Sequence, residues 1–192
     1  MWENTLDTLY RMLETRGYQA VDKVSPDIVH KLQHRQSFSH DICMAQPPVI
    51  IHLNNEKKIG IKVIRHLLQT MEKLQVRHGL CVFLQAPTPF ARRYLINLQR
   101  ENPDIRIEYF FASNMQFDIT QHALMPKHTR LPEEKKDAVL ARYGRNLALY
   151  PKILLTDPMA RYLGLQKDDM VQIERVVANQ GVATVYRVAC PA

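Results

Sequence analysis

The sequence is poor in the residues that build disulfides, phosphate-binding loops and membrane spans. It has three cysteines, Cys43, Cys81 and Cys190, and no Cys-x-x-Cys pair, which argues against disulfides and zinc fingers and favours a reducing compartment. Its six glycines form no glycine-rich phosphate loop, Gly-x-Ser-x-Gly turn or kinase motif. No apolar run approaches the roughly 18–20 residues of a membrane helix. We therefore expect a soluble intracellular protein that does not bind membranes and does not catalyse a reaction by itself.

The composition is that of a folded protein with a basic surface. Of the 192 residues, 46% are hydrophobic and 23% are charged, as in ordinary globular domains. The net charge of +7 and the pI of about 9.4 suit a nucleic-acid partner, or a place inside a larger assembly. The positive charge is spread over both halves of the chain, so neither half is a basic tail.

The first half alternates strand and helix patterns. Short apolar runs at 49–53, 80–84 and 105–111 predict strands, and apolar residues at helical spacing after residues 60 and 88 predict helices between them. Strands that alternate with helices pair in parallel through crossover connections. The sequence therefore predicts a small three-layer α/β domain over residues 1–115, with a mostly parallel sheet.

The second half, residues 116–192, has the pattern of a small α+β domain. Residues 131–144 predict a helix with Val139, Leu140 and Tyr143 facing inward. Residues 157–164 predict a shorter helix that Asp157 caps and Pro158 begins. The runs at 170–176 and 182–189 flank a turn-rich stretch, which predicts a β-hairpin.

Histidine sets and a nuclease-like pattern were candidates for chemistry. His30 and His34 share a helical face and, together with His40, could bind zinc, but the His-Glu-x-x-His pattern is absent. His122 and His128, if extended, lie about 20 Å apart at roughly 3.3 Å per residue, too far to share an ion. We expect each of these two imidazoles to hydrogen-bond a backbone group instead.

Pro26-Asp27 and Glu56-Lys57-Lys58 match the PD-(D/E)xK pattern of metal-dependent nucleases. That chemistry needs both carboxylates at a strand end, where they hold a magnesium ion. Asp27 lies at a predicted helix start and Glu56 in a predicted loop, so the spacing does not favour a metal site.

The order of motifs in the second half is highly specific. The stretches "HALMPKHTRLPEEKKDAVLARY", "YPKILLTDPMARYLGL", "VQIER" and "VYRV" resemble, in order, the C-terminal assembly domain of the shared fifth subunit of eukaryotic nuclear RNA polymerases, whose archaeal counterpart is a smaller polymerase subunit. More loosely, "TLYRMLETRGY", "IGIKVIRHLLQ" and "GLCVFLQAPTPFARR" resemble the N-terminal jaw domain of the eukaryotic subunit. The jaw has a nuclease-like α/β fold without nuclease activity, which accounts for the nuclease-like pattern.

The resemblance implies a non-catalytic polymerase subunit without a cofactor or metal ion. It implies docking on the largest subunit, contact with other polymerase subunits, and a lower-jaw position near downstream duplex DNA, with non-specific backbone contacts. The residues that match the motifs of the assembly domain, and so are implied to bind the largest subunit, are Pro126, Lys127, His128, Pro151, Asp157, Pro158, Arg161, Arg175 and Arg187. The DNA-proximal residues implied in the same way are Thr88, Pro89, Arg92 and Arg93.

Two departures from the family pattern affect these expectations. Asp168 stands where the family usually has a turn glycine, and Val176-Val177-Ala178 replaces a polar stretch. Asp tolerates a positive φ better than most residues, so the turn can persist.

The resemblance implies a nuclear protein that is not a homo-oligomer. A shortened member could instead belong to a virus-encoded polymerase and work in a cytoplasmic factory or a virion. The competing hypotheses are a metal-dependent nuclease and a stand-alone DNA-binding protein.

Overall fold

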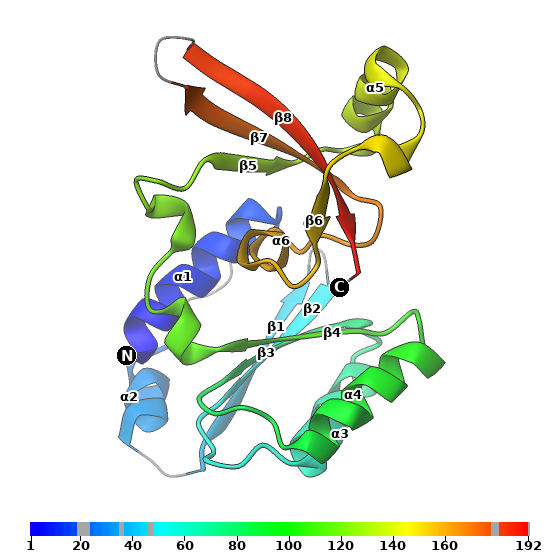
Figure 1. Ribbon diagram of the computed structural model, residues 1–192. Coiled ribbons are helices and arrows are strands. Elements are labelled where there is room, and N and C mark those ends of the chain that lie inside the picture. Colours follow the sequence, from blue (N-terminus) through cyan, green and yellow to red (C-terminus); the bar gives the residue numbers. More distant parts are fainter. Residues whose placement is uncertain (19–23, 35–36, 46–47, 178–180, 192) are drawn as a thin grey trace. The chain divides into compact units, whose positions relative to one another are not determined.

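The computed structural model describes residues 1–192 except 19–23, 35–36, 46–47, 178–180 and 192 (Figure 1). The chain divides into two compact units, Met1–Phe117 (unit 1) and Asp118–Ala192 (unit 2). Both combine helices with a β-sheet, so the expected mixed α/β class is confirmed. That unit 1 is a jaw and unit 2 an assembly domain stays a prediction. Among the described residues, no helix has both the length and the apolar character needed to span a bilayer.

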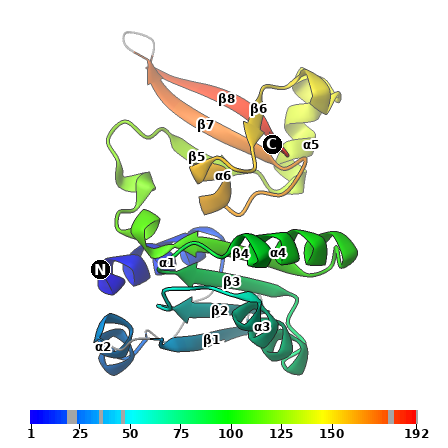
Figure 2. The same ribbon diagram turned by 60° about the horizontal axis from the view of Figure 1, so that its bottom comes forward.

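Unit 1 is built around a four-stranded sheet of order β1-β2-β3-β4 (Figure 2). Strands β2, β3 and β4 are parallel, as predicted, whereas β1 pairs antiparallel with β2 and was not predicted. The elements are α1 (Trp2–Thr15), α2 (Pro26–His34), β1 (Ser39–Ala45), β2 (Pro48–Asn54), α3 (Ile61–Lys73), β3 (His78–Phe83), α4 (Pro89–Glu101), β4 (Arg106–Phe111) and the 3-10 turns η1 (Ala112–Met115) and, in unit 2, η2 (Ile119–Gln121).

Helices α3 and α4 cover one face of this sheet. Ile64 and Leu67 of α3 and Leu95 of α4 are almost fully buried and pack against Ile50 of β2 and Ile107 of β4. Because side chains alternate along a strand, β2 and β3 carry a second set of apolar residues that points to the opposite face. Both faces are therefore buried, and the central strands consist of nearly continuous apolar runs.

Helix α1 lies on the opposite face, where it contributes to an ion cluster centred on Glu108. Arg16, at the end of α1, donates from both Nη atoms to the Glu108 carboxylate at 3.1 and 3.0 Å. His78 Nε2 lies 2.9 Å from this carboxylate and Arg106 Nη2 lies 3.0 Å from it. Glu108 alternates with Ile107, which faces α3 and α4, so the cluster joins α1 to the other side of the sheet.

Unit 2 contains a second four-stranded sheet, of order β5-β7-β8-β6. Strands β7 and β8 form the predicted antiparallel hairpin, β5 joins β7 antiparallel, and β6 runs parallel to β8. The elements are β5 (Lys127–Arg130), α5 (Glu133–Tyr143), the 3-10 turn η3 (Leu147–Leu149), β6 (Lys152–Leu154), α6 (Pro158–Tyr162), β7 (Met170–Val177) and β8 (Gly181–Cys190).

Helix α5 rests on this sheet with only one part of its surface. Val139 and Leu140 pack on the buried core residues Met170 and Val188, as predicted. Tyr143 is 59% exposed, so the prediction that it faces inward is wrong. It stands at the last position of α5, just before Gly144 turns the chain with a φ of 117°, and the core does not extend that far.

Candidate functional site

The residues of the nuclease-like pattern do not form a metal site. Asp27 lies in the first turn of α2, where its carboxylate pairs with Lys31 at 2.6 Å. Glu56 follows the end of β2, in the loop before α3. Within the described ranges, no three or more His, Cys, Asp or Glu side chains are grouped as metal ligands. The structure thus gives the nuclease hypothesis no support.

The histidine pairs have local partners. The rings of His30 and His34 lie side by side, 4.3 Å apart between centroids, on the exposed face of α2, whereas His40 belongs to β1. His122 Nδ1 accepts a hydrogen bond from the backbone of Leu124 at 3.2 Å. His128 Nδ1 lies 2.7 Å from the carbonyl of Pro126. The prediction that His122 and His128 bond to backbone groups is confirmed, although His122 is exposed.

A buried polar chain crosses unit 1 from β1 to β2. Asp41 accepts a hydrogen bond from His52 Nδ1 at 2.5 Å, and the other ring nitrogen of His52 lies 3.4 Å from the Asn54 amide. Burial by itself raises the pKa of Asp41, but the hydrogen bond and charge of His52 outweigh it and lower this pKa. The neighbouring Cys81 is fully buried, which raises the pKa of its thiol far above the ordinary range, so it is not a reactive thiolate.

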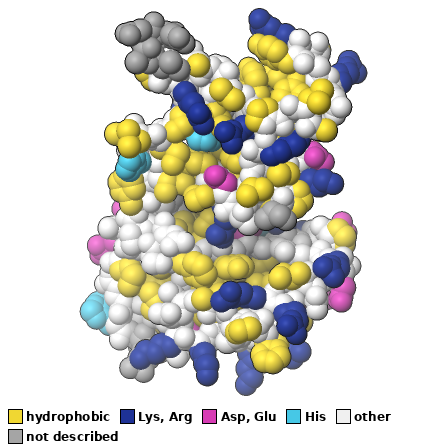
Figure 3. Space-filling view, in the orientation of Figure 1, with side chains coloured by type: hydrophobic (Ala, Val, Ile, Leu, Met, Phe, Trp, Pro, Cys, Tyr) yellow, Lys and Arg dark blue, Asp and Glu magenta, His cyan; other side chains and the backbone are white. Residues whose placement is uncertain are grey.

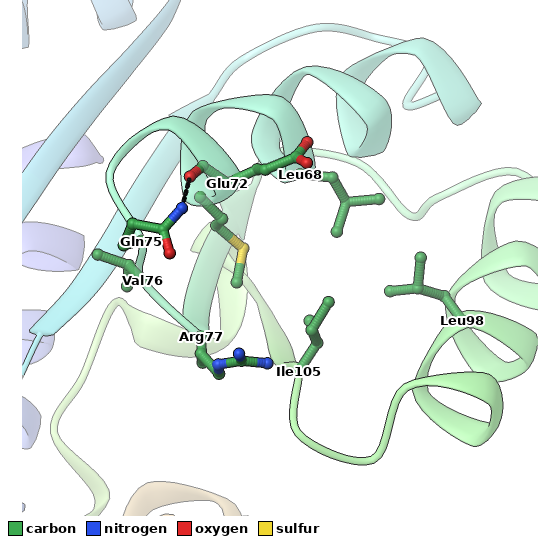
Figure 4. Close-up of a pocket in the computed structure, with 8 residues that line it drawn as sticks. Leu68, Glu72, Gln75, Val76, Arg77, Leu98 and Ile105 are labelled. Atoms are coloured by element: carbon green, nitrogen blue, oxygen red, sulfur yellow. Dashed lines mark hydrogen bonds between the residues drawn. The ribbon is translucent and has the colours of Figure 1, made fainter.

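A hollow of about 350 Å³ opens between the C-terminal ends of α3 and α4 (Figure 4). Aliphatic side chains, including Leu68, Leu98 and Ile105, form most of its wall. Glu72 is its one carboxylate, and Arg77 at its rim pairs with Asp104 at 3.6 Å. A lone carboxylate without a nearby base or metal ligand does not provide acid–base chemistry.

The predicted partner-binding residues fall into two groups at opposite edges of the unit 2 sheet. The first group, Pro126, Lys127, His128 and Arg175, lies on and beside edge strand β5. Lys127 stands opposite Glu174 of β7, and their charged groups are 3.8 Å apart. A groove of about 630 Å³ runs along these residues, between 123–127 and 174–176. Leu124 in this groove is 86% exposed.

The second group, Pro151, Asp157, Pro158, Arg161 and Arg187, surrounds edge strand β6. The carbonyl of Pro151 accepts a hydrogen bond from the backbone of Val188 at 2.9 Å, and Arg187 Nη1 donates to the carbonyl of Lys152 at 3.2 Å. Asp157 caps α6 as predicted, accepting from the backbone of Met159 at 2.8 Å.

The family turn survives the exchange of glycine for Asp168. Its φ is 67°, in the left-handed region, and its backbone N–H donates to the carbonyl of Ala189 at 3.0 Å. Of the other departure, Val176 is 87% exposed near the end of β7, whereas Ala178 lies outside the described residues.

The predicted DNA-proximal residues stand at the beginning of α4. The Thr88 side chain caps this helix by accepting from the Ala91 N–H at 3.3 Å, and Pro89 is its first residue. Arg92 Nε donates to the carbonyl of Pro87 at 3.0 Å, and both Arg92 and Arg93 are exposed. The helix N-terminus thus presents a cap, a free first turn and two cations on one surface.

Three lysines beside this helix start were missed from the sequence. A parallel bridge between Ile59 and Pro87 holds the loop before α3 against the loop before α4. The exposed side chains that this adds to the same edge of the sheet are Lys57, Lys58 and Lys62. The signal that could have found them is charge: residues 57–71 and 84–100 contain Lys and Arg but no Asp or Glu. Lys and Arg side chains are accordingly frequent over α3 and α4 in Figure 3.

Exposed prolines, cations and grooves on two mixed α/β units define a component of a larger assembly rather than a self-contained active site. Comparison with known proteins identifies which one. The family described as RNA polymerase Rpb5, C-terminal domain, matches residues 117–189. The chain belongs to this family of shared RNA polymerase subunits.

Curated relatives extend the match into unit 1. Over 139 residues, 72% of this chain, it is 32% identical to DNA-directed RNA polymerases I, II, and III subunit rpabc1 of Dictyostelium discoideum, of which it covers 70%. It is 30% identical, over the same number of residues, to subunit RPABC1 of Caenorhabditis elegans and of Caenorhabditis briggsae. The chain spans 64% of the length of these two nematode relatives.

Proposed function

We propose that this chain is a non-catalytic subunit of a multisubunit DNA-dependent RNA polymerase, and that it docks on the largest subunit through unit 2. The observation that carries the proposal is the family match, which covers unit 2 almost entirely. The related proteins are named as subunits shared by RNA polymerases I, II and III, which supports a nuclear location. A virus-encoded member would work in a cytoplasmic factory or in the virion.

The two groups of unit 2 residues suit docking for different reasons. Around β5, Lys127 and Arg175 are exposed cations beside an apolar groove, an arrangement that combines hydrophobic contact with charge-assisted hydrogen bonds. Around β6, Pro151, Pro158 and the capped start of α6 hold the chain rigid, so little conformational entropy is lost on binding. The Nε of Arg187 is buried and has no acceptor among the described residues, which leaves a donor for a partner oxygen.

Unit 1 is proposed to form part of the lower jaw, near downstream duplex DNA. Thr88, Pro89, Arg92 and Arg93 provide a helix start for a phosphate group, and Lys57, Lys58 and Lys62 enlarge the basic surface beside it. Such contacts hold the DNA backbone without reading its sequence.

The test is purification of the tagged chain from its native cell, or infected cell, at moderate salt. We expect the two largest polymerase subunits to be recovered with the wild-type chain. Lys127→Glu combined with Arg175→Glu should abolish this recovery, because both side chains are exposed and the fold does not depend on them. The control, Lys73→Glu, changes an exposed cation at the end of α3 and should leave recovery intact. Recovery of the wild-type chain without polymerase subunits would refute the proposal.

A further inference from the structure

Large apolar side chains stand uncovered at the end of α5 and in the segment that follows. Tyr143, Leu149 and Leu154 are 59%, 82% and 47% exposed. Large side chains of this kind are usually buried, and a group of them on a surface marks an interaction site. We call these three residues the α5 patch.

Contacts beneath the patch hold its parts together. The Tyr143 ring lies 5.9 Å from the Tyr186 ring between centroids, which fixes the helix end on the sheet. The Tyr150 hydroxyl donates to the carbonyl of Gly144 at 2.8 Å, which ties the segment after η3 to the end of α5. Side chains two apart on a strand point to the same side, so Leu154 shares the exposed side of β6 with Lys152. The patch is therefore a preformed surface.

The surroundings of the patch are basic. Between Asp137 and Asp157 the chain has three cations, Arg142, Arg145 and Lys152, and no Asp or Glu. All three are exposed, and none of them pairs with a carboxylate in the part of the chain that the structure describes. The space-filling view shows hydrophobic side chains gathered over α5 and the segment after it, with Lys and Arg around them (Figure 3).

We propose that the α5 patch binds an acidic segment of another polypeptide, whose aliphatic or aromatic side chains cover Tyr143, Leu149 and Leu154 while its carboxylates meet the basic rim. The rim is complementary to a negatively charged partner and guides its approach. A second copy of this chain is disfavoured, because a twofold contact through the patch brings two basic rims together. Nucleic acid is disfavoured because a phosphate backbone does not cover the leucine side chains.

The probe is a short labelled peptide that alternates Asp and Glu with Leu and Phe, added to the full chain and followed by fluorescence anisotropy. Two matched peptides replace either the acidic residues by Lys or the Leu and Phe residues by Ser. We expect only the first peptide to bind. The exposed positions of the patch allow substitution without loss of fold, which circular dichroism checks.

Leu149→Ser combined with Leu154→Ser should weaken binding at least about tenfold, a loss of about 1.4 kcal/mol. Arg142→Glu combined with Arg145→Glu should do the same and remove the dependence of the affinity on salt. Leu124→Ser and Lys73→Glu change an exposed leucine and an exposed lysine elsewhere, and should bind the peptide like wild type. Equal binding by the patch variants, or by the Ser-substituted peptide, overturns the proposal.

The inference does not depend on the proposed docking, because it is tested on the isolated chain. In cells, the patch variants should still recover the two largest polymerase subunits. If they lose these subunits, the patch is part of the docking surface and the separate site is refuted. If wild type recovers no subunits but the peptide binds at the patch, the proposed function fails and this site stands.

Discussion

Glu108 shows how one residue can decide the acid stability of unit 1. Burial by itself raises the pKa of this carboxyl, but the hydrogen bond with His78 and the charges of Arg16 and Arg106 lower it to about 2, against an ordinary value of 4.5. A pKa that is lower in the folded state means that the carboxylate stabilises the fold fully above pH 4.5. This contribution is lost as the pH falls from there toward 2.

We expect Glu108→Gln to lower the free energy of unfolding at pH 7 by roughly 3 kcal/mol at most, and to flatten its decline at acidic pH. Urea unfolding at a series of pH values between neutral and acidic measures both effects. Glu101→Gln, at the exposed end of α4, is the control and should follow the wild-type curve. An equally steep acid decline in Glu108→Gln would show that other groups dominate.

The left-handed turn at Asp168 can be tested with two substitutions in opposite directions. Glycine adopts the observed φ of 67° without strain, so Asp168→Gly should keep or raise the free energy of unfolding. Valine is β-branched, and Asp168→Val should cost roughly 1–2 kcal/mol. Lys167→Val, at the exposed neighbouring position, should cost less. Thermal unfolding of the three variants would contradict this account if both valine variants behaved alike.

At the scale of an element, α6 depends on its cap. The helix has five residues, and Asp157 accepts hydrogen bonds from two of its first backbone N–H groups. Asp157→Ala should therefore lower the free energy of unfolding by about 1 kcal/mol, whereas Asp157→Asn, which keeps an acceptor, should retain most of it. Urea unfolding measures both.

The same pair of variants separates capping from partner contact. If Asp157→Asn folds with wild-type stability but no longer recovers the polymerase subunits, the carboxylate contacts the partner. If it recovers them, Asp157 acts through the helix.

Sequence patterns predicted elements whose packing is local and failed where packing came from elsewhere. The helix at α4 is indicated by Thr88-Pro89, and β2 by its β-branched run, because cap and strand preference are read directly from neighbouring residues. Strand β1 starts with Ser39, His40 and Asp41, which have no strand pattern. Its place in the sheet depends on pairing with β2 and on the Asp41–His52 hydrogen bond, neither of which a local pattern contains.

At the scale of the whole molecule, binding to duplex DNA should depend on both loops of the basic edge. The logarithm of the association constant falls with the logarithm of salt concentration by about 0.9 for each phosphate contact. Lys57→Ala combined with Lys58→Ala should weaken binding to any duplex and lower this slope by roughly two contacts. Lys135→Ala combined with Lys167→Ala, in unit 2, should not change it. An unchanged slope in the first variant would exclude these lysines from the contact.

The candidate site could be predicted only in part from the sequence. Resemblance supplied Lys127 and Arg175, and the structure places them beside one groove, but it gave no indication that Pro151 and Arg187 lie at the far edge of the sheet. That separation follows from the strand order, which depends on long-range pairing of β6 with β8. The lysines before α3 also needed the structure, because only the Ile59–Pro87 bridge brings them to α4.

The placement of β5 and β6 at opposite edges also has a kinetic consequence. A partner that holds both edges is bound twice, and after one contact opens the other keeps it at a high effective concentration. Release then requires both contacts to open within one short interval, so residence is much longer than either contact alone provides. Substitutions at one edge will understate that edge, and only variants at both edges reveal how firmly the chain is retained.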